Sequence, residues 1–449
     1  MSENQQNSGT LGRKLGLSAV IALGVGSTIG TGIFSTMSEV ALAAGSSLFL
    51  VLAFFIGALL QLPASFCYSE LSSAYPEDGG YYVYLREAGS RPLAFLCGWV
   101  CFWATDPPSV SIMALGLVNY LSVLLPFDNF VLRMIAVGVI LIFMFLHLRS
   151  VKAGGIFQIC ITILKLLPFI IIIGFGIFFI NQELFMNAQI SDGFHGQPGF
   201  IALFAAISAT TFAFDGMYSP CYLSGEVKNP RRVLPIGLIA TAIIILLLYT
   251  GLTMVSTGML SIDQIANSPA PIALVASQIP FIGHYAGLVV AIMAVLVILG
   301  SMSSAIMYQP RIEYAMAKDG YFFKVFGIVS KKYNTPSGAI IAHCMLIILL
   351  TFVGNLTELL GYFTLVSLIK NLMAISTIVV LRKKEGYNPF YRAPLGWLFP
   401  IIAIVMNLIL IIVTFIAAPI GGVVCAVAMI ATGLPAYYFW NRRKTKNNE

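Results

Sequence analysis

Long apolar runs alternate with short polar segments along the chain from residue 16 to residue 440. A helix that crosses a bilayer needs about 20 predominantly apolar residues, and each run is about that long or longer. The pattern therefore predicts an all-α polytopic membrane protein with 12 transmembrane helices, at residues 16–44, 46–71, 92–125, 131–149, 155–180, 199–223, 233–258, 282–316, 337–354, 358–381, 396–417 and 420–440. Because the number is even, both ends of the chain are expected on the same side of the membrane.

The composition excludes a soluble protein. Hydrophobic residues make up 59% of the chain and charged residues 10%, against about 25% charged residues in soluble globular domains. So few charged side chains could not cover a soluble surface. The seven cysteines lie in or beside apolar runs, where a free thiol behaves as a small apolar side chain, so no disulfide framework is expected.

The basic residues indicate the orientation in the membrane. If the N-terminus is cytoplasmic, 22 of the 25 Lys and Arg residues fall in the tails and the cytoplasmic loops, as the positive-inside rule requires. Both tails, residues 1–15 and 441–449, are then cytoplasmic, and the protein is expected in the cell (plasma) membrane. The net charge of +7 follows from this topology, so it does not indicate a nucleic-acid partner.

Four glycines interrupt the first span: Gly24, Gly26, Gly30 and Gly32, in the segment G-V-G-S-T-I-G-T-G. Each glycine weakens a helix by about 1 kcal/mol relative to alanine. The spacing of Gly26 and Gly30 would suit a helix–helix contact face, but the four glycines lie on several faces of a helix. A break in the helix is therefore favoured, since irregular backbone at membrane depth is tolerated where it lines a cavity.

The sixth span contains a second candidate break. Its segment T-F-A-F-D-G-M includes Asp215 and Gly216, and Pro220 follows shortly after. Transporters built from inverted repeats carry broken helices at corresponding positions of each half, and these two spans are five apart. We therefore expect a ten-helix core at residues 16–381, formed by 5+5 inverted repeats at about 16–180 and 199–381, followed by two extra helices at 396–440.

Four sequence stretches, spread over ten spans, carry a resemblance to a known family. They are G-S-T-I-G-T-G-I-F at 26–34, Y-S-E-L-S-S-A-Y-P-E-D-G-G-Y-Y-V-Y-L at 68–85 with L-C-G-W at 96–99, F-A-F-D-G at 212–216 with G-E-V-K-N-P-R-R-V-L-P at 225–235, and P-R-I-E-Y-A-M-A-K-D-G-Y at 310–321. In these stretches the chain resembles the amino acid–polyamine–organocation (APC) superfamily, and within it the L-type amino acid transporters. The resemblance implies the LeuT fold, with helices 1 and 6 broken.

The resemblance also implies a substrate site between the two broken helices. The implied substrate-binding residues are Ser27, Thr28, Ile29, Gly30, Thr31 and Gly32 on the first span and Phe212, Ala213, Phe214 and Asp215 on the sixth. The N–H groups of Thr31 and Gly32 would hold the substrate carboxylate, together with the Ser27 hydroxyl, at the positive end of a half-helix. Carbonyl groups of Thr28, Phe212 and Asp215 would hold the α-amino group. Phe212 takes the position of the family's aromatic gate.

Lys165 is expected near the middle of the membrane, where a charge costs about 2.5–3.5 kcal/mol even on lenient scales. A lysine whose ammonium reaches the membrane surface is the alternative, but half a bilayer is too far for the side chain. The resemblance supplies a role: sodium-independent relatives carry a lysine here in place of a bound cation. Lys165 is then expected to contact the carbonyl end of the first half-helix near Gly26 and to couple substrate occupancy to gating.

Two further charges, Asp106 and Lys370, lie inside predicted spans. One interpretation is an ion pair or two separately hydrated charges with a structural role. The other is that one or both select the substrate side chain. An unpaired Asp106 would favour cationic substrates or a proton step, and an unpaired Lys370 would favour acidic ones.

These observations together predict a sodium-independent amino acid transporter that works by alternating access as an exchanger (antiporter). The alternative is a proton-coupled symporter of amino acids or amines that uses Lys165 or Asp106. The four histidines (His147, His195, His284 and His343) are solitary in the sequence, so no metal, cofactor or enzymatic activity is expected. The loop P-F-D-N-F between spans 3 and 4 has no cysteine, and the resemblance therefore implies no heavy-chain subunit.

Overall fold

The structure is a computed structural model of the whole chain, and it describes residues 11–186, 199–268, 270–279, 283–353, 356–417 and 420–448. Regular structure in these residues is helical, with only two isolated β-bridges. The longer helices are α3 (Ser47–Ala74), α6 (Asp106–Leu124), α7 (Asn129–Arg149), α8 (Val151–Gly176), α12 (Pro230–Met259), α15 (Ala286–Tyr308), α17 (Ser337–Val353), α18 (Leu356–Leu381), α19 (Leu398–Ala417) and α20 (Ile420–Asn448). The shorter helices are α1 (Leu17–Thr28), α2 (Thr31–Ala44), α4 (Tyr81–Glu87), α5 (Arg91–Val100), α9 (Gln182–Met186), α11 (Gly199–Ala209), α13 (Ile262–Ala266), α14 (Pro271–Ser277) and α16 (Pro310–Lys318).

Eight helical segments of the described chain are long and apolar enough to cross a membrane. They are Leu17–Phe34, Ser47–Ala74, Asn129–Arg149, Val151–Phe179, Pro230–Met259, Gly287–Lys318, Leu398–Phe415 and Val423–Thr445. Two shorter apolar helices, Ser337–Val353 and Leu365–Leu381, accompany them. The prediction of a helical, multi-pass membrane protein is therefore confirmed.

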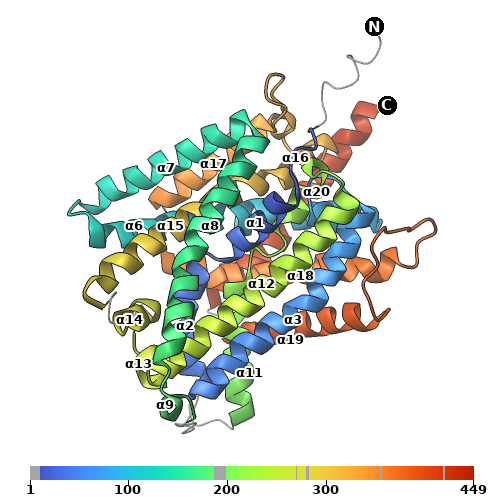
Figure 1. Cartoon of the computed structure of the whole chain (residues 1–449). Coiled ribbons are helices and arrows are strands. Elements are labelled where there is room, and N and C mark those ends of the chain that lie inside the picture. Colours follow the sequence, from blue (N-terminus) through green and yellow to red (C-terminus); the bar gives the residue numbers. More distant parts are fainter. Residues whose placement is uncertain are drawn as a thin grey trace.

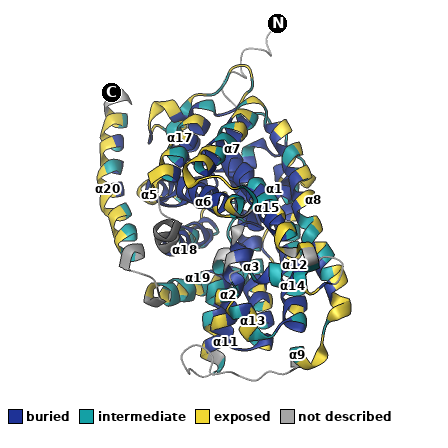
Figure 2. Ribbon diagram, turned by 90° about the vertical axis from the view of Figure 1, so that its left-hand side faces the viewer, coloured by how far each residue is buried: buried dark blue, intermediate teal, exposed yellow. Residues whose placement is uncertain are grey.

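Apolar side chains cover much of the outer surface. Phe178 is 80% exposed, Leu247 68% and Ile163 63%, which suits contact with lipid rather than water. By contrast, nine of the twelve residues of α1 are buried, because α1 packs against α8, α12 and α15. Figure 2 shows α1 and α15 in the buried centre, with α20 at the edge of the molecule. The polar, glycine-rich first span is thus shielded from lipid.

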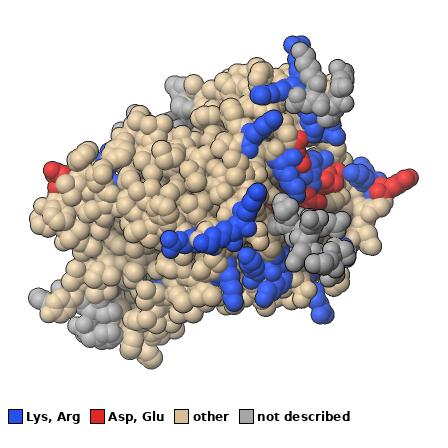
Figure 3. Space-filling view, turned by 90° about the horizontal axis from the view of Figure 1, so that it is seen from above, with Lys and Arg blue, Asp and Glu red and all other residues tan. Residues whose placement is uncertain are grey.

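Charged side chains gather towards one end of the molecule, and the opposite end is largely free of them (Figure 3). Both ends of the described chain lie near α16. Lys14 N–H donates to the Glu226 carbonyl, Glu226 pairs with Arg311 on α16, and Lys444 near the end of α20 bonds the carbonyl of Asp319 just after α16. Figure 1 shows the start of α1, α16 and the end of α20 in the same region.

Two features of the architecture depart from the sequence expectation. The C-terminal residues expected as a tail are helical, because α20 continues to Asn448; its basic residues suit the negative end of the helix dipole. In addition, short helices such as α4 and α13 occupy connections between the predicted spans. The hydrophobic pattern does not identify helices this short.

Candidate functional site

The first span is broken between α1 and α2. Helical geometry ends at Thr28 and resumes at Thr31, and both intervening residues are non-helical: Ile29 has φ −76° and ψ 86°, and Gly30 has φ −121° and ψ −152°. The residue before α2, Gly30, has no side chain that could cap the helix. The break therefore turns the positive end of one half-helix and the negative end of the other towards the same point inside the protein.

The second break lies in the sixth span. Helix α11 ends at Ala209, a 3₁₀ turn covers Thr210–Phe214, and a second 3₁₀ turn begins only at Ser219. Between them Gly216 has φ +89°, a backbone conformation that residues other than glycine rarely adopt. The Asp215–Gly216 pair thus interrupts the helix in the way the sequence suggested, and glycine is required for the backbone geometry.

The two breaks touch each other. A Cβ atom added at Gly216 would lie 2.8 Å from the carbonyl oxygen of Ser27, so only a glycine allows this approach. The Ser219 hydroxyl donates to the Ser27 hydroxyl at 3.0 Å. Tyr249 on α12 joins both breaks, because its hydroxyl lies 3.1 Å from the Ala213 carbonyl and 3.3 Å from the Thr28 carbonyl.

A narrow cavity of about 40 Å³ lies at this contact. The first break contributes Ser27, Thr28, Gly30 and Gly32, the second Asp215 and Gly216, and the surrounding helices Ser109, Ile112, Met113, Tyr308 and Phe363. This cavity is smaller than a typical small-molecule site of about 300–1,000 Å³, so its walls must move apart for an amino acid to bind there. Its wall combines backbone polar groups from the breaks with apolar side chains from α6 and α18.

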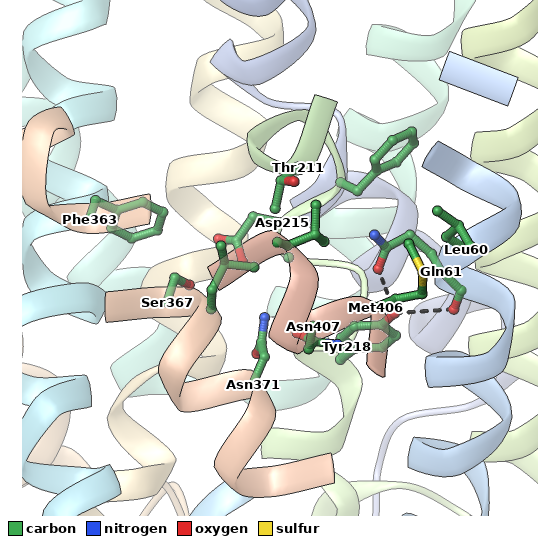
Figure 4. A pocket seen from close by; sticks show the side chains of 14 residues that line it. Leu60, Gln61, Thr211, Asp215, Tyr218, Phe363, Ser367, Asn371, Met406 and Asn407 are labelled. Carbon is green, nitrogen blue, oxygen red and sulfur yellow. Dashed lines mark hydrogen bonds between the residues drawn. The ribbon is translucent and has the colours of Figure 1, made fainter. Parts of the chain in front are cut away.

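Two neighbouring cavities share Asp215, Gly216 and Phe363 with the first. One, of about 20 Å³, extends to the charged pair Asp106 and Lys370. The other, of about 50 Å³, lies between α3, the second break, α18 and α19. Figure 4 shows Asp215 and Ser367 facing this space, with the Tyr218 hydroxyl bonded to Gln61. The unwound Asp215–Gly216 backbone is the wall common to all three.

Lys165 on α8 is completely buried and lies at the end of α1. Its ammonium donates to the carbonyl of Gly26, as the sequence analysis expected, and also to the carbonyl of Ile29 at 2.7 Å and the Ser301 hydroxyl at 3.2 Å. Ser301 in turn lies within hydrogen-bond distance of both carbonyls. The Lys165 side chain therefore satisfies the carbonyl groups that the break exposes at the negative end of α1.

Asp106 and Lys370 form a buried ion pair across α6 and α18. The Lys370 ammonium lies 3.4 Å from Asp106 Oδ1 and 3.2 Å from the Thr105 hydroxyl, and 5.7 Å from the centre of the Tyr81 ring. Of the interpretations given in the sequence analysis, the structure therefore supports an ion pair between Asp106 and Lys370. One carboxylate oxygen of Asp106, Oδ2, is left without a hydrogen-bond partner among the described residues.

A local irregularity places Asp106 at this wall. Residues Cys101–Thr105 form a π-helical turn directly before α6, and Pro107 and Pro108 follow Asp106. A proline has no N–H to continue a helical ladder, and π-turns occur frequently at functional sites. The D-P-P sequence thus marks the position at which α5 and α6 meet.

Some expected site residues lie partly outside the described structure. The side chains of Thr31 and Phe212 are outside the described part, so the aromatic gate remains a prediction. Conversely, the sequence analysis missed Tyr249 and Ser301. Each is a polar residue within an apolar run, I-I-I-L-L-L-Y-T-G and L-G-S-M-S-S, and that isolation was the available signal. Among the described residues, no three His, Cys, Asp or Glu side chains are grouped to hold a metal ion.

The chain is similar to known transport proteins over nearly its whole length. The amino acid permease family matches residues 15–436. The serine/threonine exchanger SteT of Bacillus subtilis is 28% identical over 97% of this chain and 98% of its own length. The b(0,+)-type amino acid transporter 1 of Mus musculus is 27% identical over 96% and 88%, and the methylthioribose transporter of Bacillus subtilis is 28% identical over 99% and 97%. The chain belongs to the amino acid permease family of the APC superfamily and is a membrane transporter rather than an enzyme.

Proposed function

We propose that this protein is a sodium-independent amino acid exchanger that works by alternating access. The observation that carries the proposal is the contact between the two breaks, with a narrow cavity at that point. Broken helices that meet at a cavity are typical of transporters with inverted repeats. The resemblance to a serine/threonine exchanger over nearly the whole of both chains supports exchange rather than one-way transport.

The proposed binding mode uses the backbone at both breaks. The substrate carboxylate would accept hydrogen bonds from N–H groups at the start of α2, including Thr31 and Gly32, beside the Ser27 hydroxyl. The α-amino group would donate to carbonyl groups around Thr28, Phe212 and Asp215. The opposite partial charges of the two helix ends support this orientation of a zwitterion. Phe212, as the aromatic gate, would cover the bound substrate.

Sodium independence is supported by the surroundings of Lys165. A bound sodium ion would need several oxygen ligands, and the carbonyls of Gly26 and Ile29 together with Ser301 Oγ offer such a set. The Lys165 ammonium already occupies the space between them. We propose that it acts as a built-in cation, which links the geometry of the first break to α8 and so to gating.

The broader architecture belongs to the same proposal. We propose 12 transmembrane helices in a LeuT fold, with repeats at about 16–180 and 199–381, two further helices at 396–440 and both tails in the cytoplasm. The gathering of Lys and Arg at one end of the molecule supports the cytoplasmic position of both tails. The transporter is proposed to act without a heavy-chain subunit.

Side-chain selectivity is assigned to the cavity around Asp106 and Lys370. Because the two charges are paired, neither by itself favours cationic or acidic substrates. The pair offers a carboxylate acceptor beside an ammonium donor, which suits uncharged side chains that can hydrogen-bond. The apolar residues Ile112 and Met113 on the same helix face the substrate cavity and would limit side-chain size.

Counterflow in proteoliposomes tests the proposal. Vesicles that contain purified protein and unlabelled amino acids should take up radiolabelled amino acids without sodium, whereas vesicles without internal amino acid should take up little. Accumulation into empty vesicles under a pH gradient would instead establish the proton-coupled symporter, and a requirement for sodium would contradict the role of Lys165. A competition panel of amino acids and amines then identifies the substrates.

A further inference from the structure

A chain of buried hydrogen bonds runs from the substrate cavity to an acidic side chain that the proposed mechanism does not use. It begins at Ser109, on the cavity wall. Gln309 Nε2 donates to Ser109 Oγ at 3.0 Å. Gln309 Oε1 lies 3.1 Å from His343 Nε2, and His343 Nδ1 lies 3.1 Å from Glu313 Oε1. The side chains of both His343 and Glu313 are completely buried.

The directions of these hydrogen bonds fix one proton on His343. The Ser109 hydroxyl donates its only proton to the Asp106 carbonyl at 2.7 Å, so Ser109 must accept from Gln309. The amide nitrogen of Gln309 therefore faces Ser109, and its amide oxygen faces His343. Since an amide oxygen only accepts, His343 Nε2 must carry a proton.

One further proton must lie between His343 Nδ1 and Glu313 Oε1. An ionised carboxylate and an unprotonated ring nitrogen are both acceptors, so they would repel each other at 3.1 Å. The proton resides either on the ring, as imidazolium and carboxylate, or on the carboxyl group, with a neutral ring. In both forms the pair has no net charge, whereas loss or gain of a proton leaves an uncompensated charge in the protein interior, which is costly.

We infer that His343 and Glu313 form a proton-binding site whose occupancy is linked through Gln309 and Ser109 to amino acid binding in the cavity. This inference rests on the proposed function, since it requires an amino acid in that cavity. The amide group of Gln309 does not itself gain or lose a proton. It links the pair to Ser109 because its amide group is polarised by the charge state of His343 and bonds the cavity wall at its other end.

The direction of the linkage follows from desolvation. A bound amino acid displaces water from the cavity and so lowers the polarity around the relay. Lower polarity favours the neutral pair, which holds one shared proton, over either charged form. Substrate binding therefore draws a proton onto the pair when the pH is high, and by reciprocity the bound proton favours substrate binding.

Several charged and titratable groups lie on the helices packed against α16 and α17. Asp106 on α6 is bonded to Lys370 on α18, and Arg311 on α16 to Glu226. On α7, Arg133 donates to the carbonyls of Thr351 and Phe352, and His147 lies 3.0 Å from the Ser303 hydroxyl. The Phe102 ring lies against His343. Glu313 Oε2 has no partner among the described residues, which leaves it a second position for a proton.

The pH dependence of exchange tests the inference. Proteoliposomes are loaded with the standard L-amino acids, and uptake of the same mixture in radiolabelled form is measured between about pH 5 and pH 9. Wild-type exchange should fall as the pH rises. His343→Gln and Glu313→Gln should both change this dependence, because each variant removes one of the two groups that share the proton. His147→Gln, a buried histidine outside the relay, is the matched control and should keep the wild-type profile.

A dye measurement on the wild-type protein does not depend on any variant. Detergent-solubilised protein is mixed at alkaline pH with the amino acid mixture, adjusted to the same pH, and a pH-sensitive dye reports protons taken up. Proton uptake supports the inference, and Gln309→Leu should reduce it. Active exchange with no proton uptake at any pH, or a wild-type pH profile in His343→Gln, would overturn the proton site and leave the exchanger intact. Absence of amino acid exchange in the wild type would instead overturn the proposed function.

Discussion

Gly216→Ala provides the sharpest test of the contact between the two breaks. At φ +89°, an alanine would be strained by about 1–3 kcal/mol. Its Cβ would also lie 2.8 Å from the Ser27 carbonyl oxygen and 3.0 Å from the Ser27 Cβ. Such overpacking costs about 1–3 kcal/mol more. The nearest of these atoms belong to the Ser27 carbonyl group and the third is the Ser27 Cβ, so none can move aside as the end of a flexible side chain would.

A combined penalty of at least about 2 kcal/mol corresponds to an equilibrium change of about thirtyfold. Exchange should therefore fall by about that factor, because the conformation in which the breaks touch becomes rare. The assay is counterflow in proteoliposomes that contain equal amounts of folded protein, as judged by size-exclusion chromatography.

Gly138→Ala is the matched control. Gly138 lies within α7, and nothing would be within 4 Å of an added Cβ there, so alanine should stabilise the helix by up to about 1 kcal/mol and leave transport unchanged. Wild-type exchange in Gly216→Ala would refute the close approach of the two breaks, and with it the proposed site.

Three further substitutions address individual contacts. Lys165→Ala should reduce exchange by about tenfold or more, since it removes a charged hydrogen-bond donor worth about 1.5–3 kcal/mol; wild-type counterflow in this variant would remove the gating role. Tyr249→Phe keeps the ring but loses the hydroxyl that joins the breaks, so apparent KM should rise by about fivefold for a bond of about 1 kcal/mol, and an unchanged KM would contradict it. Asp106→Asn alone should lower the thermal stability in detergent by about 3–5 kcal/mol, because it leaves a buried charge unpaired, whereas the double variant Asp106→Asn, Lys370→Met should recover most of that loss. Equal losses in the single and double variants would show that the pair makes no contribution as a pair.

Much of the fold could be predicted from the sequence because the membrane simplifies the problem. Apolar runs must be helical inside a bilayer, where backbone groups have no water to bond. The glycines around Gly26 and the D-G pair at Asp215 likewise marked the breaks, since glycine both weakens a helix and permits unusual backbone angles. For Lys165, burial of a charge required a partner, and the resemblance to the APC superfamily implied the carbonyl end of the first half-helix.

The relay of Ser109, Gln309, His343 and Glu313 was not predicted. In the sequence His343 is a solitary histidine, and its partners lie 30 and 34 positions away, too far for any helical spacing to connect them. Only the packing of α16 and α17 against each other brings these side chains within hydrogen-bond distance. The same holds for Tyr249, whose hydroxyl reaches both breaks from a third helix.

By itself, the sequence determined the long apolar helices, where two of them break and the buried charges Lys165, Asp106 and Lys370 inside apolar runs, because these depend on local composition and on the cost of placing polar groups in lipid. The tertiary structure alone decided which groups meet. It paired Asp106 with Lys370, brought Gly216 against Ser27 and enclosed His343 with Glu313, since contacts between distant helices depend on how side chains of particular size pack across the bundle.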